Sequence, residues 1–255
     1  MLWYKSWLET RSRFLIGLAL LFCSAAATVF TYPKVVQLLT AVPAVGVGGV
    51  IGQKIREAAD LAREYRGYVW STWFRQNLAQ MCTIFAVLLG TGGLLAQVSG
   101  GGALFTLSLP ASRTRLLAVR AATGLGELLV LAVVPSLLIP LLSPAVGQTY
   151  GLGDALVHSL FLFVAGSVFF SLAFLLSTVF RDVWRPLLIA LALAAVIGLA
   201  EQVVDGLSHH GLFAVMSGER YFRGHGVPWL GLITMAALSA AMLYRATVNL
   251  ARRDF

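Results

Sequence analysis

Long apolar stretches without charge constrain this chain more than any other feature of its sequence. Residues 14–32 and 78–98 contain no Asp, Glu, Lys or Arg. Hydrocarbon offers a peptide group no hydrogen-bonding partner, so a segment that crosses about 30 Å of it forms a helix of about 20 apolar residues. The chain is 58% hydrophobic and 12% charged, and its mean hydropathy is +0.83. This composition excludes a water-soluble domain and also excludes disorder.

The apolar pattern predicts an all-α polytopic membrane protein with a single transmembrane domain over residues 1–255. The six expected spans are residues 14–32, 78–98, 116–142, 155–180, 187–204 and 227–244. Residues 1–13 place Trp3, Tyr4 and Trp7 among polar neighbours, which predicts an interfacial helix on the membrane surface.

Residues 33–76, between the first two expected spans, are expected to form a loop outside the membrane. They include an uncharged run, residues 35–51, which Pro43 and several glycines interrupt. We interpret this run as a loop or a re-entrant segment, with a seventh span as the alternative. Further along, a helical spacing of apolar residues predicts a surface helix through Ile55, Ala58, Ala59 and Ala62.

Charges in the short connections predict the orientation, because Lys and Arg near span ends tend to stay in the cytoplasm. Residues 99–115 carry two arginines and no acid, whereas residues 143–154 carry no cation. Six spans then place both termini in the cytoplasm, although residues 54–75, with five cations and three acids, come to lie outside. We therefore attribute the net charge of +8 to topology, and we expect the lipid bilayer, not nucleic acid, as a partner.

Several kinds of chemistry are missing from the sequence. It contains no phosphate-binding loop of the form G-x-x-x-x-G-K-[ST], and none of its lysines follows a glycine. Cys23 and Cys82 fall in expected spans without ligand-like spacing, and His209 and His210 are adjacent in an expected outer loop. We therefore predict no metal site and no cofactor bound by this chain.

Two ionisable residues fall inside the third expected span and form a candidate intramembrane polar site. Arg120 and Glu127 stand seven residues apart, on one face of a helix. Charges inside a membrane are costly and are usually functional. Either the two residues pair through a neighbour or line a cavity, or Arg120 extends to the interface while Glu127 makes a polar contact between helices.

Residues 151–154 read Gly-Leu-Gly-Asp, a pattern of intramembrane aspartyl proteases. Those enzymes need two aspartates on separate spans, and no other expected span contains one. Asp154 also stands at an expected helix start, where a carboxylate caps free backbone N–H groups. An intramembrane hydrolase is one alternative function for the chain, and a membrane scaffold that transports nothing is another.

The segment 83–120 shows an apolar span, a Gly-rich stretch and a Leu-x-Leu-Pro-x-Ser-Arg run. That run contains Leu107, Leu109, Pro110, Ser112, Arg113 and Arg115. In this segment the sequence resembles the permease subunits of type-2 ABC transporters. The similarity extends to Tyr221, Gly224, Pro228 and Trp229, and to the ending Arg252, Arg253, Asp254, Phe255. One position departs from the family, because Gln97 stands where an acid is usual.

The resemblance implies a six-span subunit that pairs with a second permease copy or a paralogue in the plasma (bacterial inner) membrane. We call the run through Arg113 and Arg115 the coupling loop. In the family, this loop and the N-terminal interfacial helix would dock to a separate ATPase subunit that binds ATP and Mg²⁺. Closure of the ATPases would drive alternating access, as in an exporter. The family also implies an outer gate between the fifth and sixth spans, where Glu201 and Asp205 are the candidate residues.

Overall fold

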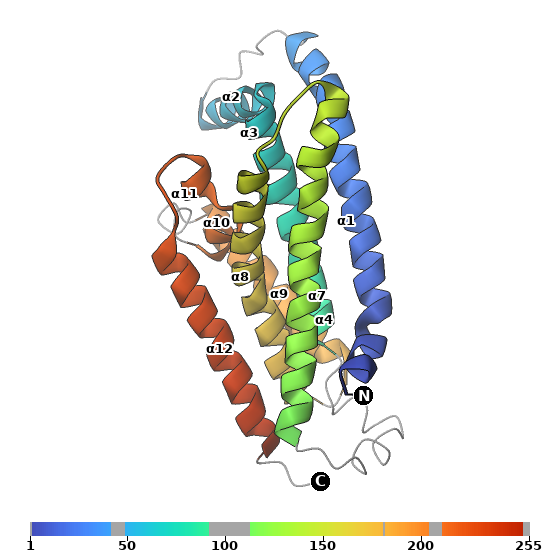
Figure 1. The fold of residues 1–255 in the computed structure, drawn as a ribbon. Helices are drawn as coiled ribbons and strands as arrows, with labels where there is room; N and C mark the ends of the chain where they lie inside the picture. The colour runs from blue at the N-terminus through green and yellow to red at the C-terminus, as the bar shows by residue number, and fades with distance from the viewer. Residues whose placement is uncertain (1, 42–48, 92–112, 181, 204–210, 252–255) are drawn as a thin grey trace.

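The computed structural model describes residues 2–41, 49–91, 113–180, 182–203 and 211–251. Within these ranges the regular structure is entirely helical, without a strand. The long helices lie side by side in an elongated bundle (Figure 1). The first turn of α1 and the last turn of α12 lie at the same end of the bundle, which we call the terminal end. The segments α2, α3 and α11 lie toward the opposite end, the distal end.

Five long helices make up most of the bundle. They are α1 (Leu2–Ala41), α7 (Arg113–Leu142), α8 (Leu152–Ser177), α9 (Trp184–Val203) and α12 (Trp229–Ala251). Shorter helical segments connect them or fold against them. These are α2 (Gly49–Arg63), α3 (Tyr65–Val69), the π-helix η1 (Trp70–Leu78), α4 (Ala79–Gly90), the 3₁₀ turn η2 (Ser143–Val146), α10 (Leu212–Ser217) and α11 (Glu219–Phe222).

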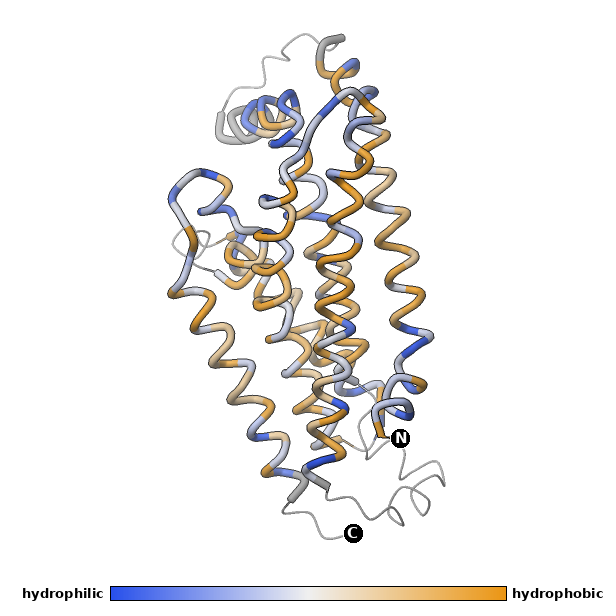
Figure 2. The backbone as a smooth tube through the Cα atoms, viewed as in Figure 1, coloured by the Kyte–Doolittle hydropathy of each residue, from blue (hydrophilic) through white to orange (hydrophobic). Residues whose placement is uncertain are grey.

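Among the described residues, five helical segments are long and apolar enough to cross a membrane. They are Leu2–Leu39, Thr114–Val146, Leu152–Ser177, Trp184–Val203 and Trp229–Asn249. Hydrophobic residues cover the middle of these helices, and hydrophilic ones gather toward their ends and in the connections (Figure 2). The part of the chain that the structure describes is therefore all-helical and has the features of a polytopic membrane protein.

α3, η1 and α4 follow one another without a break, and we call them together the 65–90 helix. The sequence predicts a span over 78–98, whereas this helix starts much earlier and ends at Gly90. Its first half enters the bundle because Trp70, Trp73 and Phe74 are buried there. The Trp70 indole N–H donates to the Ser217 carbonyl at 2.9 Å. Residues 92–98 of the expected span lie outside the described residues.

The N-terminal region also differs from the expectation. Residues 2–13 do not form a separate interfacial helix, because α1 runs without interruption through the first expected span to Ala41. No Gly or Pro precedes Gly17, so nothing in the sequence breaks the helix near residue 13.

The expected outer loop, residues 33–76, is largely helical. α1 includes Pro33 and continues to Ala41, α2 follows, and the 65–90 helix has begun before residue 76. The uncharged run 35–51 therefore splits between the end of α1 and the start of α2, and residues 42–48 lie outside the described part of the chain. The predicted surface helix over residues 55–62 falls within α2.

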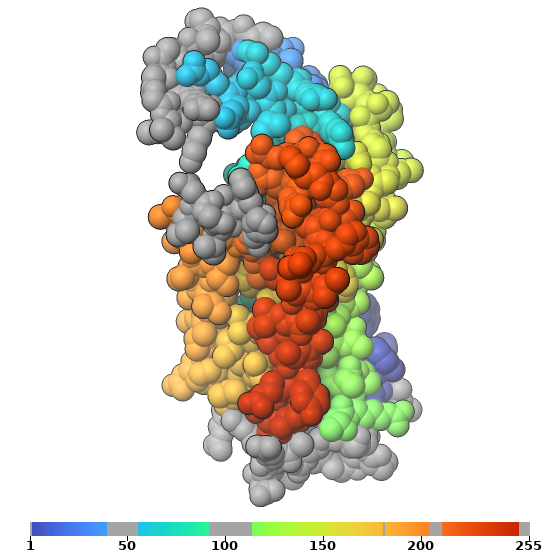
Figure 3. All heavy atoms as spheres, turned by 90° about the vertical axis from the view of Figure 1, so that its left-hand side faces the viewer, coloured from blue at the N-terminus to red at the C-terminus, as the bar shows by residue number. Residues whose placement is uncertain are grey.

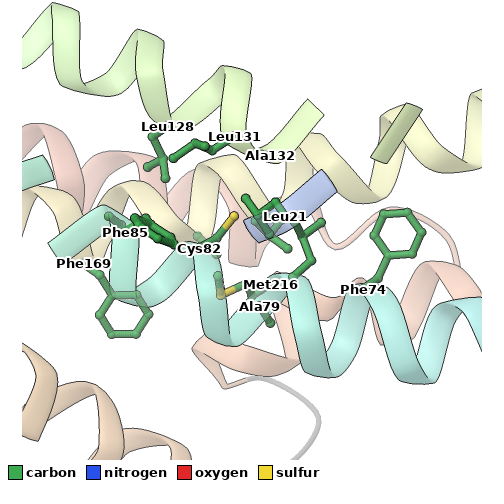
Figure 4. Packing of buried hydrophobic residues seen from close by; sticks show 14 of the residues in the cluster. Leu21, Phe74, Ala79, Cys82, Phe85, Leu128, Leu131, Ala132, Phe169 and Met216 are labelled. Carbon is green, nitrogen blue, oxygen red and sulfur yellow. The ribbon is translucent and has the colours of Figure 1, made fainter. Parts of the chain in front are cut away.

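α8 is the most enclosed of the five long segments, because α4, α7, α9, α10 and α12 all pack against it. A Cβ at Gly90 would lie 2.5 Å from the Phe170 carbonyl oxygen, so α4 and α8 touch through their backbones. The buried cluster in Figure 4 joins Leu21 of α1, Cys82 of α4 and Leu128 of α7. Met216 of α10 also belongs to it, so this short helix folds back into the bundle.

Candidate functional site

The two ionisable residues predicted in the third span both contact the first turns of α1. The Arg120 Nη1 donates to Glu9 Oε2 at 3.1 Å. The Thr10 hydroxyl donates to the Glu127 carboxylate. The Arg120 side chain is only 11% exposed, so it forms an ion pair between helices instead of extending to the interface. Glu127 makes a polar contact between helices, as the second alternative expects, but the extension of Arg120 to the interface, which belongs to the same alternative, is not seen.

Arg13 connects the same part of α1 to α4. Its Nη1 donates to the carbonyl oxygens of Leu88 at 2.7 Å and Thr91 at 3.1 Å. These carbonyls belong to the last turn of α4 and its C-cap, where a helix leaves acceptors free and carries partial negative charge. A guanidinium at this position therefore satisfies acceptors that the helix itself cannot use.

We call the set of side chains Glu9, Thr10, Arg13, Arg120 and Glu127 the polar clamp. It joins the first turns of α1 to the end of α4 and to the first half of α7, where Arg120 and Glu127 lie. Those two helices, α4 and α7, flank residues 92–112, which contain most of the predicted coupling loop. Leu107, Leu109, Pro110 and Ser112 of that loop, and the side chain of Arg113, lie outside the described residues. Arg115 is exposed in the first turn of α7.

The polar clamp is not fully satisfied. Arg120 Nε, Glu127 Oε2 and the nearby Ser6 hydroxyl are buried and have no hydrogen-bond partner among the described residues. Buried polar atoms without partners reduce stability, and native structures keep few of them. Sites that retain such atoms are candidates for function, because packing alone does not account for them.

The aromatic residues of the N-terminal segment lie on the outside of the bundle. Trp3, Tyr4 and Trp7 are all exposed, while Ser6 and Thr10 on the same helix are buried. The first three turns of α1 therefore present an exposed aromatic face and a buried polar face.

Glu201, a predicted gate residue, holds the start of α10. Its carboxylate accepts hydrogen bonds from the backbone N–H of Phe213 at 3.0 Å and of Ala214 at 3.3 Å. A carboxylate at a helix N-terminus satisfies free N–H groups and interacts favourably with the helix dipole. Asp205, the other predicted gate residue, lies outside the described residues.

Asp154 binds neighbouring segments at the distal end. Its carboxylate pairs with Arg66 of α3 at 3.2 Å and accepts from the Tyr221 hydroxyl of α11 at 3.2 Å. Asp154 lies in the first turn of α8, so the expected helix start is confirmed, but the expected cap is wrong, because the N-cap is Gly151 and no side-chain cap bond is made. The Arg66 partner draws the carboxylate toward α3. On the flank shown in Figure 3, α11 accordingly lies between α12 and the α2–α3 segment.

Sequence reasoning missed three residues of the polar clamp. Glu9, Thr10 and Arg13 lie just before the first apolar run, in the stretch for which the sequence predicts an interfacial helix. Thr10 and Arg13 follow Glu9 by one and four residues, which places all three toward one side of a helix, and this spacing is the signal that the sequence offers. No group of three or more His, Cys, Asp or Glu side chains that could hold a metal occurs in the described ranges.

Comparison of the chain with protein-family models, with curated proteins and with solved structures found no match.

Proposed function

We propose that this chain is the transmembrane permease subunit of an ABC transporter of the type-2 architecture, an exporter with six spans and cytoplasmic termini. In this proposal the 65–90 helix, which comes second in sequence order, is a span in addition to the five long apolar helices. It is helical throughout and packs against α1, α7 and α8. A separate ATPase subunit would bind ATP and Mg²⁺, and a second permease copy or a paralogue would complete the transporter in the plasma (bacterial inner) membrane.

The polar clamp is the observation that carries the proposal. A permease must convert a push on its cytoplasmic loop into a movement of its helices. The polar clamp links the end of α4 and the first half of α7, the two helices that flank residues 92–112, to the first turns of α1 through charged hydrogen bonds. Charge-assisted hydrogen bonds of this kind are short and strong, so a displacement of either helix would move α1 with it.

Purification of the tagged chain from its native membranes in a mild detergent tests the proposal. We expect a second chain with a phosphate-binding loop to co-purify in a fixed ratio, and the complex to hydrolyse ATP. Recovery of the chain without such a partner in several mild detergents, and without hydrolysis, would contradict the proposal.

A further inference from the structure

The 65–90 helix is largely buried in the bundle but has one face that no other described segment covers, which we call the open face. Along this face Thr72 is half-buried and Gln76, Gln80 and Ile84 are exposed, at a regular spacing of four residues. Arg75, beside Gln76, is exposed as well. The face is thus cationic and polar nearer the distal end and apolar further along. The same order of groups, charge first, then neutral polar atoms, then hydrocarbon, occurs along a phospholipid.

The cationic part of this face lies at the membrane boundary. Phe74, next to Arg75 in sequence, contacts the ring of His158 with 4.9 Å between centroids. His158 stands about 9 Å beyond Leu152, the first residue of α8. A helix of 26 residues exceeds the hydrocarbon thickness by about 9 Å, and the ion pair of Asp154 with Arg66 indicates that the excess lies at the distal end. Arg75 therefore lies where hydrocarbon meets headgroups.

Arg75 is held in place without a carboxylate. Its guanidinium lies 5.5 Å from the centre of the Trp70 ring, which stacks on Phe222 at 4.3 Å, and Arg66 lies over Phe222 at 5.7 Å. In the described ranges Arg66 pairs with Asp154 and Arg223 with Glu219, whereas no carboxylate lies within ion-pair distance of Arg75.

A guanidinium that rests on an aromatic face keeps its N–H groups free at its edge. Those groups match the oxygens of a phosphate or carboxylate, which a guanidinium can bind through two parallel hydrogen bonds. Gln76 adds an exposed amide beside Arg75.

The exposed amide of Gln80, further from the distal end on the same face, needs a polar group as a hydrogen-bonding partner. Gln80 stands five residues beyond Arg75, which places its backbone about 7 Å further into the bundle. At this depth acyl chains offer an exposed amide no hydrogen-bonding partner, so a bare hydrocarbon neighbour would be unfavourable. The interfacial layer of a bilayer, which holds the headgroups and ester groups, is itself about 5 to 8 Å thick on each side. A phospholipid whose phosphate binds Arg75 therefore lies deeper than its neighbours by about the thickness of this layer, and its ester groups reach the level of Gln80.

We propose that Arg75 and Gln76 bind the headgroup of an anionic lipid, that Gln80 binds its ester groups, and that its acyl chain lies along Ile84. The occupant is a lipid and not a soluble anion, because the cation lies at the membrane boundary and the face ends as an apolar surface. This inference does not depend on ATPase coupling, so it stands or fails separately from the proposed function.

Quenching of tryptophan fluorescence by brominated lipids tests the site. In a full-length chain whose exposed Trp3, Trp7, Trp184 and Trp229 are replaced by Phe, the buried Trp70 and Trp73 remain as reporters near the site. The protein is reconstituted with increasing fractions of brominated phosphatidylglycerol or brominated phosphatidylcholine. We expect the anionic lipid to bind about fivefold more strongly, as one cation near a membrane surface provides.

Variants at the cation localise the effect. Arg75→Gln should abolish the preference, and Arg75→Lys should keep part of it, since the charge stays but the paired hydrogen bonds are lost. Arg220→Gln, which removes an exposed arginine from α11, should leave the preference unchanged. Gln80→Leu should weaken the binding of both lipids alike while keeping the preference, because both lipids carry ester groups.

Two results would overturn the proposal. The first is equal quenching by both lipids in the reporter chain itself, a result that does not depend on whether the variants fold. Equal quenching is also the result if a second copy of the chain covers the face and neither lipid reaches the two tryptophans. An unchanged preference in a folded Arg75→Gln protein is the other, because that result means that Arg75 only extends toward water.

Discussion

At the scale of single residues, the polar clamp concentrates charge in a part of the bundle that excludes water. Arg120 is almost fully buried, and its ion pair is made with Glu9, which is about three-quarters buried. A buried ion pair adds little net stability compared with an apolar pair, but removal of one partner leaves the other charge uncompensated. The polar clamp is therefore sensitive to changes that preserve shape and alter charge.

Glu9→Gln tests this sensitivity. We expect a loss of about 3 kcal/mol in the free energy of unfolding, because the Arg120 guanidinium keeps its position and loses its carboxylate. The matched control is Glu219→Gln, which breaks an ion pair with the half-exposed Arg223 and should cost less than about 1 kcal/mol. Reversible unfolding in mixed micelles gives both values. Equal losses for the two variants would contradict the burial argument.

For Tyr150 we expect that loss of a polar group preserves or increases the free energy of unfolding, unlike the change at Glu9. Its hydroxyl is buried and has no hydrogen-bond partner among the described residues, and burial raises the pKa of its phenol above the ordinary value of 10.0. Tyr150→Phe should be neutral or stabilising by up to about 1 kcal/mol. Tyr65→Phe, the control, loses a hydrogen bond with the Ser143 hydroxyl and should destabilise by about 1 kcal/mol.

The same tyrosine predicts a dependence on pH. A phenol whose pKa is raised in the folded state must stay neutral there, so its contribution to stability is intact below about pH 10. That contribution is lost as the pH rises from the unfolded-state pKa toward the folded-state pKa. The stability of Tyr150→Phe should therefore exceed that of the wild type by a growing amount above pH 10 in unfolding titrations. A constant difference across that range would contradict the assignment.

At the scale of elements, close packing of α4 on α8 depends on Gly90. A Cβ there would lie 2.5 Å from the Phe170 carbonyl oxygen, a backbone atom that cannot turn away. Gly90→Ala should therefore separate the two helices and destabilise the chain by about 1 to 3 kcal/mol. Gly126→Ala on α7 is the control, because a Cβ at Gly126 meets nothing within 4 Å. It should be neutral or slightly stabilising, since Ala favours a helix over Gly.

The sequence predicts the later helices well and the earlier ones poorly. The expected segments 116–142, 155–180, 187–204 and 227–244 coincide with α7, α8, α9 and α12, and their starts agree within three residues. Uninterrupted apolar sequence identifies a helix of this kind from composition alone.

The first half of the 65–90 helix escaped prediction because its polar residues suggested a loop. Arg75, Gln76 and Asn77 interrupt the apolar pattern there. The structure buries Trp73 and Phe74 beside them, while Arg75 and Gln76 lie on the open face. A helix with one polar face and one buried aromatic face has no long apolar run for the sequence to show.

The partners of Arg120 and Glu127 could not be predicted either. Glu9 and Thr10 lie more than 110 residues away from them in the sequence. Only the packing of α1 on α7 brings these side chains together, and apolar periodicity does not specify which helices become neighbours.

At the scale of the whole molecule, charged contacts at the two ends of the bundle are joined by one helix. The 65–90 helix meets the polar clamp at Leu88. Near its other end, Trp70 of this helix contacts α10 through the hydrogen bond to the Ser217 carbonyl. Between these points the helix packs against α8, and its Cys82 and Phe85 side chains are buried in the bundle. A movement of the polar clamp thus has a continuous packed route to the short helices α10 and α11.

Reversal of the charges of the predicted coupling loop is the most direct test of the central proposal, that a separate ATPase drives this chain. In the complex purified from native membranes, Arg113→Glu with Arg115→Glu should reduce the co-purified ATPase and its hydrolysis by at least about tenfold, because loss of complementary charge across an interface costs several kcal/mol. Arg220→Glu with Arg223→Glu makes the same charge change at the distal end and should leave both unchanged. Unaltered association and hydrolysis after reversal at Arg113 and Arg115, in a protein that stays folded, would contradict the account.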